Sequence, residues 1–183
     1  MLTHKGTVVL HTKRLILRQF AISDAERMYY NWANDPEVTR YLFWQTHKSV
    51  DETLAILERW QEQYTDNSIY NWCIEFQPDK DIIGSITLGD IDGNHHRAYV
   101  GYCIGKAWWG QGVVAEALRA VLDFSFGEVG FQRVAAYHHI ANTASGRVME
   151  KAGMQREGIM RQYLLDKDGN YADAALWSAV RSS

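Results

Sequence analysis

The sequence contains only two cysteines, Cys73 and Cys103, which stand far apart and form no C-x-x-C pair. This argues against a structural metal site and predicts a reducing compartment. No run approaches the ~20 apolar residues that span a membrane, and the N-terminus lacks an apolar run followed by a cleavage site. We therefore expect a soluble cytoplasmic protein with no membrane partner.

An excess of positive charge is also missing. The net charge is −3, which argues against direct nucleic-acid binding because such surfaces are basic, and which weakly favours a cationic substrate. The 183 residues are expected to form one domain over 1–183 with a sizeable core. Seven tryptophans and ten tyrosines are many, and we expect some of them to line a ligand surface.

The most informative stretch, residues 98–126, reads AYVGYCIGKAWWGQGVVAEALRAVLDFSF. Its first part alternates as a strand does, and its last part has the apolar period of a helix. Between them, Gly110 and Gly112 let the backbone approach a ligand closely, and the helix start offers N–H groups and a positive dipole end. The pattern predicts a phosphate site. A plain glycine-rich turn before an amphipathic helix is the alternative.

Similar patterns place the other elements. We expect strands at 14–18, 70–76, 82–91, 132–137 and 174–180, and helices at 23–33, 49–64 and 142–151. Capping boxes at Ser23 and Ser49 open the first two helices. Leu164 and Leu165, with a turn at 166–170, form a closing hairpin with 174–180.

The order of these elements predicts the fold class. Three strands with short connections form an antiparallel meander before the glycine loop, and the strand–helix–strand unit around the loop is parallel and right-handed. The chain is therefore α+β, with a mixed, mostly antiparallel sheet and helices on both faces. The aromatic segment 41–44 is read as a hydrophobic bridge between two helices or as a wall of a substrate cleft.

Two common phosphate motifs do not fit. The glycine loop satisfies G-x-G-x-x-A, but a dinucleotide fingerprint follows the first strand of a doubly wound unit and has an acidic residue about 20 positions later. Here a meander precedes the loop, and the next strand ends in Tyr137-His138-His139. No G-K-[ST] follows, which excludes a Walker A loop.

Four motifs in sequence order point to one family. They are Thr12-Lys13-Arg14-Leu15-Ile16-Leu17-Arg18, Trp109-Gly110-Gln111-Gly112, Asn142-Thr143-Ala144-Ser145 and the stretch 150–158, EKAGMQREG. With a bulged strand before the loop and A-x-E-A in the helix after it, the chain resembles the GNAT acyl-CoA N-acyltransferases. The resemblance covers nearly the whole chain and is greatest for the Rim-type branch, which includes ribosomal-protein N-terminal acetyltransferases.

The resemblance implies an acetyl-CoA site. The backbone of Cys103 and Ile104 would pair with the pantetheine arm, and Asn142 would hydrogen-bond the arm while also capping its helix. Ser145 matches the residue proposed in Rim-type enzymes to protonate the departing thiolate. The amides implied to hold the pyrophosphate are those of Trp109, Gly110, Gln111, Gly112, Val113 and Val114.

Three positions depart from the family pattern. Many GNAT enzymes have a tyrosine acid where this chain has Met149, and an arginine or glutamine where it has Ala107. The glutamate proposed as base in some Rim-type relatives falls at Leu164, so a base cannot be transferred from the family.

The remaining base candidates are Asp90 and Asp92 at the end of a strand, followed by His138 and His139. Of these we select Asp90 as the catalytic candidate beside Ser145, because Asp92 fits a turn residue in Asp-Gly-Asn. His95 and His96 lack further ligands at a metal-binding spacing.

The expected function is direct transfer of acetyl from acetyl-CoA to a primary amine in a ternary complex, without a metal. The acceptor is a protein N-terminal α-amine, such as that of a ribosomal protein, or another peptide, polyamine or aminoglycoside. A covalent route through Cys103 is not expected, because no histidine is paired with it. A non-catalytic acyl-CoA-binding module and a dinucleotide-dependent oxidoreductase are the alternatives, and a homodimer stays open.

Overall fold

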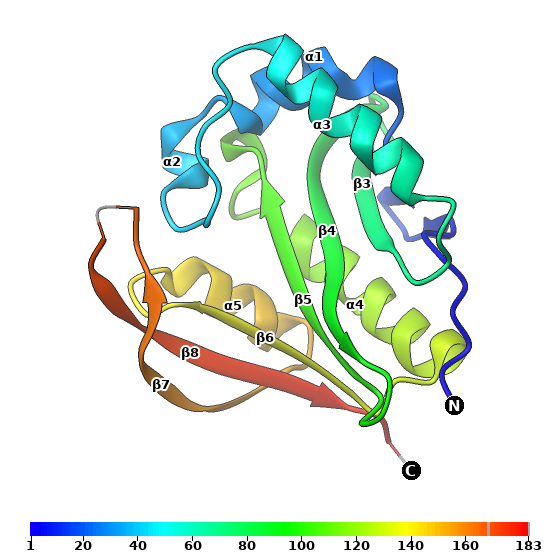
Figure 1. Cartoon of the computed structure of the whole chain (residues 1–183), viewed down its shortest axis with the longest axis vertical. Coiled ribbons are helices and arrows are strands. Elements are labelled where there is room, and N and C mark those ends of the chain that lie inside the picture. Colours follow the sequence, from blue (N-terminus) through cyan, green and yellow to red (C-terminus); the bar gives the residue numbers. More distant parts are fainter. Residues whose placement is uncertain (168, 183) are drawn as a thin grey trace.

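The computed structural model describes residues 1–167 and 169–182. Its strands form one eight-stranded sheet in the order β1-β2-β3-β4-β5-β6-β8-β7 (Figure 1). Among the described residues, only β5 and β6 pair in parallel, and all other neighbouring strands are antiparallel. The strands are β1 (Leu10–His11), β2 (Leu15–Arg18), β3 (Tyr70–Phe76), β4 (Asp81–Asp92), β5 (Arg97–Ile104), β6 (Arg133–His139), β7 (Gln155–Leu165) and β8 (Tyr171–Val180). The predicted mixed, mostly antiparallel sheet is confirmed.

Helices cover both faces of this sheet, as the sequence predicts. The α-helices are α1 (Ala25–Met28), α2 (Pro36–Thr39), α3 (Val50–Gln63), α4 (Val113–Phe124) and α5 (Thr143–Lys151). Shorter helical turns are η1 (Ile22–Asp24), η2 (Tyr29–Ala33), η3 (Lys106–Trp108) and η4 (Ser125–Val129). The turns η1 and η2 extend α1 at its two ends, so together they form the helix expected at 23–33.

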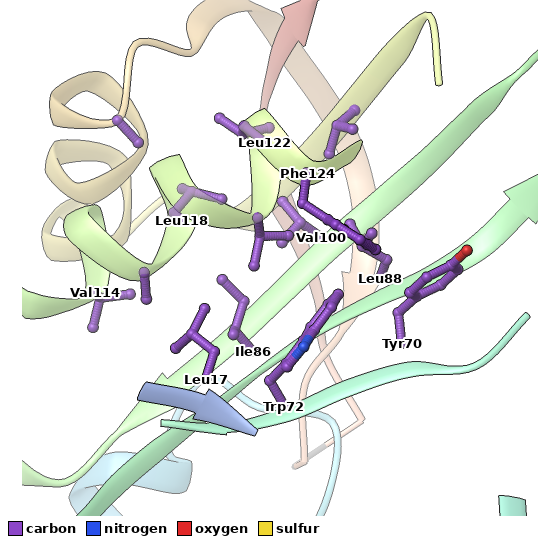
Figure 2. Packing of buried hydrophobic residues seen from close by; sticks show 14 of the residues in the cluster. Leu17, Tyr70, Trp72, Ile86, Leu88, Val100, Val114, Leu118, Leu122 and Phe124 are labelled. Carbon is purple, nitrogen blue, oxygen red and sulfur yellow. The ribbon is translucent and has the colours of Figure 1, made fainter. Parts of the chain in front are cut away.

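The larger core lies between the sheet and α4 (Figure 2). Leu118 of α4 lies over Trp72 and Ile86 of the central strands, and all three are fully buried. Val121 of α4 is a fully buried member of the same cluster. Burial of each such aliphatic side chain contributes roughly 1.5–3 kcal/mol. This packing fixes the start of α4, and with it the glycine loop, relative to β5.

A second core lies on the opposite face, under α1 and α3. Trp32 and Leu57 are fully buried there, and Trp44 packs against the same cluster. Trp44 therefore acts as the predicted hydrophobic bridge. Its neighbour Phe43 is 90% exposed, so the aromatic segment is only partly used in the core.

The two predicted capping boxes have different outcomes. Ser49 caps α3 by accepting the Glu52 N–H at 3.2 Å, while the Glu52 carboxylate accepts the N–H of Lys48. The box at Ser23 is wrong, because the helical segment begins earlier with Ala21 as N-cap. Asp24 accepts the Ala21 N–H at 2.8 Å and is also held by Arg18, which places the first turn there.

The strands β5 and β6 pair only at one end and then diverge (Figure 1). Their register covers Arg97–Tyr99 against Arg133–Ala135. Beyond this point β6 continues along β8 as far as His139 opposite Ala174. Within residues 1–167 and 169–182, the side of β5 that faces β6 is therefore without a strand partner from Val100 to Ile104.

The C-terminal hairpin is longer than predicted. Leu165 pairs with Tyr171 as expected, but β7 begins at Gln155. Residues 155–159 are exposed and carry no alternating pattern, so the edge strand has no sequence signal. Asp168, within the predicted turn, lies outside the described residues. Beside it, Lys167 Nζ donates to the Thr39 carbonyl at 2.7 Å and ties the hairpin to α2.

Candidate active site

The glycine loop has the backbone shape of an anion site. Gly110 and Gly112 have φ angles of 76° and 74°, in the left-handed region that favours glycine. The first bond into α4 runs from the Glu116 N–H to the Gly112 carbonyl at 3.2 Å. Among the described residues, the N–H groups from Gly110 to Ala115 donate to no protein acceptor. The Trp109 N–H is used within the loop, by the Lys106 carbonyl at 3.2 Å.

An ion pair from the start of the chain fixes this loop. The Glu116 carboxylate accepts the Thr12 hydroxyl at 2.7 Å, the Arg14 N–H at 2.9 Å and Arg14 Nε at 2.7 Å. Arg14 Nη1 also donates to the Gln111 carbonyl at 3.1 Å. The Thr-Lys-Arg motif thus orients the loop and places a guanidinium close to Gly112, where it adds to the attraction for an anion.

We expect Glu116→Gln to lower the free energy of unfolding at neutral pH by about 1 kcal/mol, the typical size for such a partly exposed pair. Burial opposes ionisation here, but the hydrogen bonds from Thr12 and Arg14 outweigh it and lower the pKa of Glu116 below its usual 4.5. A lowered folded-state pKa gives stability that is present above the unfolded value and is lost as pH falls.

The check is denaturant unfolding of both proteins across acidic pH. The difference between wild type and Glu116→Gln should shrink as pH falls below about 4.5. A difference that stays constant between about pH 7 and pH 3 would show that the charge of Glu116 contributes nothing.

Only every second residue of β5 directs its backbone N–H and C=O groups to the open edge. The Gly105 N–H donates to the Ile83 carbonyl at 2.8 Å, and a Cβ on Gly84 would lie 2.3 Å from the Cys103 carbonyl oxygen. Because strand backbone groups alternate in direction, Cys103 faces β4, whereas Ile104 and Tyr102 face the diverging side. The Ile104 carbonyl accepts Trp109 Nε1 at 3.1 Å.

The Cys103 thiol does not have the features of a nucleophile. Its sulfur lies 3.4 Å from Ser85 Oγ, and burial raises its pKa to about 11. The thiol therefore stays protonated and weakly reactive at neutral pH.

Asn142 and Ser145 meet at the start of α5. Asn142 is the N-cap, and its Oδ1 accepts the Ser145 N–H at 3.3 Å. The Ser145 side chain is half-buried, and its Oγ lies 2.8 Å from the Tyr102 hydroxyl. Met149, where many relatives have a tyrosine acid, is only 2% exposed and belongs to the core.

Tyr102 is the site residue that sequence reasoning missed. It reaches from β5 to α5, and its hydroxyl also lies 3.0 Å from the Ser145 carbonyl, to which it donates. Burial raises the pKa of Tyr102, so its proton stays in place at neutral pH. The sequence did contain a signal for this contact. Tyr102 shares the core-facing side of β5 with Val100 and Ile104, and a buried phenol needs a hydrogen-bond partner.

Three of the four base candidates are occupied. Asp92 accepts the N–H groups of Asn94 and His95, and its pKa is lowered to about 2, chiefly by the ring of His95. It is a turn residue, which confirms that reading. His138 accepts Trp177 Nε1 at 3.1 Å, and burial lowers its pKa.

The second ring nitrogen of His138 is engaged as well. Since Nε2 accepts the bond from Trp177, Nδ1 carries the hydrogen and donates to the His139 carbonyl at 2.9 Å. His139 Nδ1 in turn accepts the Ala141 N–H at 3.0 Å. Neither histidine presents a free lone pair in this arrangement.

Asp90 remains as the free candidate. It lies at a bulge in β4, where the register against β5 shifts between Gly89 and Asp92, and its φ angle is 47°. This bulge is in β4, whereas the sequence pattern placed one in the strand before the loop. Among the described residues, the exposed Asp90 carboxylate makes no hydrogen bond or ion pair.

No cluster of three or more metal-ligating side chains forms within 1–167 and 169–182. In the same part of the chain, no helix is long and apolar enough to cross a membrane.

Known proteins are similar to this chain in sequence and in fold. Residues 14–155 match the family model described as "Acetyltransferase (GNAT) domain". The uncharacterized N-acetyltransferase YoaA of Bacillus subtilis (strain 168) is 33% identical over 94% of this chain and 97% of its own. The [ribosomal protein uS5]-alanine N-acetyltransferase of Escherichia coli (strain K12) is 30% identical over 92% and 89%.

A solved structure agrees with the fold. The microcin C7 self immunity acetyltransferase MccE, in complex with acetyl-CoA and AMP, superposes with a TM-score of 0.81 at 20% identity, over 92% of this chain and 93% of its own.

The chain is an acetyltransferase of the α+β class that uses acetyl-CoA as acetyl donor. It belongs to the GNAT family. The free amides of the glycine loop fit the phosphates of this donor, and the open edge of β5 fits its amide-containing arm.

Proposed function

We propose that this N-acetyltransferase acts on the N-terminal α-amine of a peptide or protein, such as a ribosomal protein, by direct transfer in a ternary complex. One observation carries the proposal, the arrangement of three features around the end of β5. They are the unpaired edge of β5, the contact of Tyr102 in β5 with Ser145, and the free amides of the glycine loop that follows β5. The relative that acetylates alanine of ribosomal protein uS5 supports this acceptor class.

The donor side would use the backbone. The amides from Gly110 to Val114 would hold the pyrophosphate, with Trp109 at the edge of the loop. The pantetheine arm would pair along the open side of β5 through the backbone of Tyr102 and Ile104. The expectation that Cys103 also pairs with the arm is wrong, because its backbone groups face β4. Asn142 would donate its side-chain N–H₂ to the arm while its oxygen caps α5.

The reaction needs a hydrogen-bond donor for the departing sulfur and an acceptor for the amine proton. The amine nitrogen attacks the thioester carbonyl carbon, the C–S bond breaks, and the thiolate leaves with the electron pair. Tyr102 gives its single proton to the Ser145 carbonyl, so the Ser145 hydroxyl donates to Tyr102 in this structure. When the thiolate leaves, the Ser145 hydroxyl would turn and donate its hydrogen bond to the sulfur instead. The proton released by the amine would pass to Asp90, directly or through water, because Asp90 is the candidate carboxylate that makes no hydrogen bond or ion pair with the described part of the chain.

We expect Asp90→Asn to lower kcat/KM for a peptide α-amine by about tenfold at pH ~7. Asparagine tolerates the positive φ angle at this bulge, so the fold should be kept. The effect should become smaller above pH ~8, where the α-amine loses its proton without help. Equal pH profiles for wild type and variant would remove Asp90 from the mechanism.

The function is tested by release of free CoA from acetyl-CoA with several amines. The acceptors are a hexapeptide with a free N-terminal alanine, the same peptide with its N-terminus blocked and one lysine, spermidine, and an aminoglycoside. Release with the free N-terminus and not with the blocked peptide supports the proposal. Acetyl-CoA binding without release for any amine would indicate a non-catalytic binding module.

A further inference from the structure

Three tyrosines meet where β5 and β6 separate. Tyr99 comes from β5, Tyr137 from β6 and Tyr163 from β7. The rings of Tyr99 and Tyr137 are 5.8 Å apart at 67°, and those of Tyr137 and Tyr163 are 5.1 Å apart at 79°. We name these residues the tyrosine cluster. Tyr99 belongs to the last paired position of β5 with β6, so the cluster lies at the inner end of the open edge.

The cluster is on the face of the sheet opposite α4. Cys103, which shares its side of β5 with Tyr99, packs against the core under α1 and α3. Val134 and Ala136, which lie on the opposite face of β6 from Tyr137, point into the α4 core. The three tyrosines belong to neither core. Tyr163 is 50% exposed and the other two are half-buried, so their rings form an accessible aromatic surface.

A negative charge lies beside this surface. Asp90 follows Gly89, which pairs with Tyr99. The pKa of Tyr137 is raised by burial first, and then by the nearby Tyr163 and Asp90. Two basic side chains lie near Tyr99, Arg133 and, two residues earlier on the same side of β5, Arg97. The charge of each is offset by an ion pair, Arg133 with Glu157 and Arg97 with Asp92.

We propose that the tyrosine cluster and Asp90 form the binding site for the acceptor's ammonium group. The inference rests on the proposed function and adds what recognises the acceptor. Aromatic faces attract cations through the ring quadrupole, and a carboxylate strengthens that attraction. The ammonium is thus held next to the end of the open strand edge. Asp90 takes one proton from it before the attack and passes this proton to water, so that Asp90 can accept the second proton, which the nitrogen releases after it bonds to the carbonyl carbon.

The same chemistry sets the substrate class. An amine whose neighbouring group is uncharged, as at a peptide N-terminus, fits the site. A free amino acid places its carboxylate against Asp90 and the electron-rich ring faces, which both repel it. Peptide α-amines are therefore preferred over free amino acids.

The test uses two peptides that differ only in charge. A hexapeptide carrying an N-terminal trimethylglycyl group keeps a permanent cation that cannot be acetylated, and its 3,3-dimethylbutanoyl counterpart is the neutral match. We expect the cationic peptide to inhibit wild-type acetylation of the alanine hexapeptide at least ~10-fold more strongly. Tyr137→Leu and Tyr163→Leu should each reduce this ratio by roughly 3-fold or more, and Tyr163→Phe should preserve it.

Equal inhibition by the two peptides in wild type would overturn the inference, as would leucine variants that keep the full ratio. Tyr163 lies on an exposed edge, so its leucine variant should fold, and thermal melting checks this. If the alanine hexapeptide is not acetylated but the cationic peptide binds preferentially in calorimetry, the site stands and the proposed function fails. If acetylation occurs without charge preference, the function stands and the site fails.

Discussion

Gly112→Asp is expected to raise the Kd for acetyl-CoA by about 100-fold or more, which corresponds to about 2.7 kcal/mol. The new carboxylate would lie beside free amides that are proposed to meet phosphate, and two negative charges at such short distance repel each other strongly. The nearest atom to a Cβ at this position is Arg14 Nη2, 4.0 Å away. The aspartate can therefore pair with the guanidinium and also remove its charge from the site.

Gly112→Asn is the matched control. Asparagine and aspartate both tolerate the left-handed region better than other side chains, so the two variants carry similar backbone strain at φ 74°. They differ in charge. We expect the asparagine variant to lose roughly 10-fold or less in affinity, measured by calorimetry on folded protein. Equal Kd values for both variants and wild type would place the phosphates elsewhere.

Ser145→Ala is expected to lower kcat with little change in acetyl-CoA affinity. A hydrogen bond from a serine to a developing thiolate stabilises the transition state by roughly 1–3 kcal/mol, which is on the order of 5- to 150-fold in rate. Ser145 is well placed for this role, because Tyr102 at 2.8 Å holds its hydroxyl and Asn142 caps its N–H. Asn142→Ala should in contrast also weaken acetyl-CoA binding.

Tyr102→Phe tests the hydrogen bond between Tyr102 and Ser145 separately from the packing of the Tyr102 ring. It keeps the ring that contributes to the core and removes only the hydroxyl that contacts Ser145. We expect a kcat loss smaller than that of Ser145→Ala, and a double variant no worse than Ser145→Ala alone. If Ser145 only packs the first turn of α5, its alanine variant would lower the melting temperature and leave kcat per folded molecule unchanged.

The sequence predicted the fold where side chains alternate or repeat with a clear period. The strand and helix around Gly110 and Gly112 were found because Val100, Val114 and Leu118 mark their buried sides. The end of the edge strand β7, at Leu164 and Leu165, was predicted, but its first part was missed because those residues are exposed on both faces and their pattern shows no period. The start of the first helix was misplaced because a tertiary contact, Arg18 with Asp24, determines it.

Some residues of the candidate site could be predicted from the sequence, and others could not. Gly110, Gly112 and Asn142 could be predicted, because a glycine turn and a helix N-cap depend only on the local sequence. Tyr102 meets Ser145 across 43 positions, and the tyrosine cluster joins three strands, so those contacts exist only once the sheet order is known. The hydrogen bond that occupies His138 could not be predicted for the same reason, because its partner Trp177 lies 39 positions away.

The most direct test of the proposed function is mass spectrometry of an alanine-initiated peptide after incubation with the protein and acetyl-CoA, with fragmentation to locate the modification. Wild-type protein is expected to add one acetyl group at the N-terminal nitrogen, with one equivalent of free CoA released. The Gly112→Asp variant should add none under the same conditions. Acetyl found only on a lysine side chain, or no acetyl on any peptide despite acetyl-CoA binding, would contradict transfer to an N-terminal α-amine.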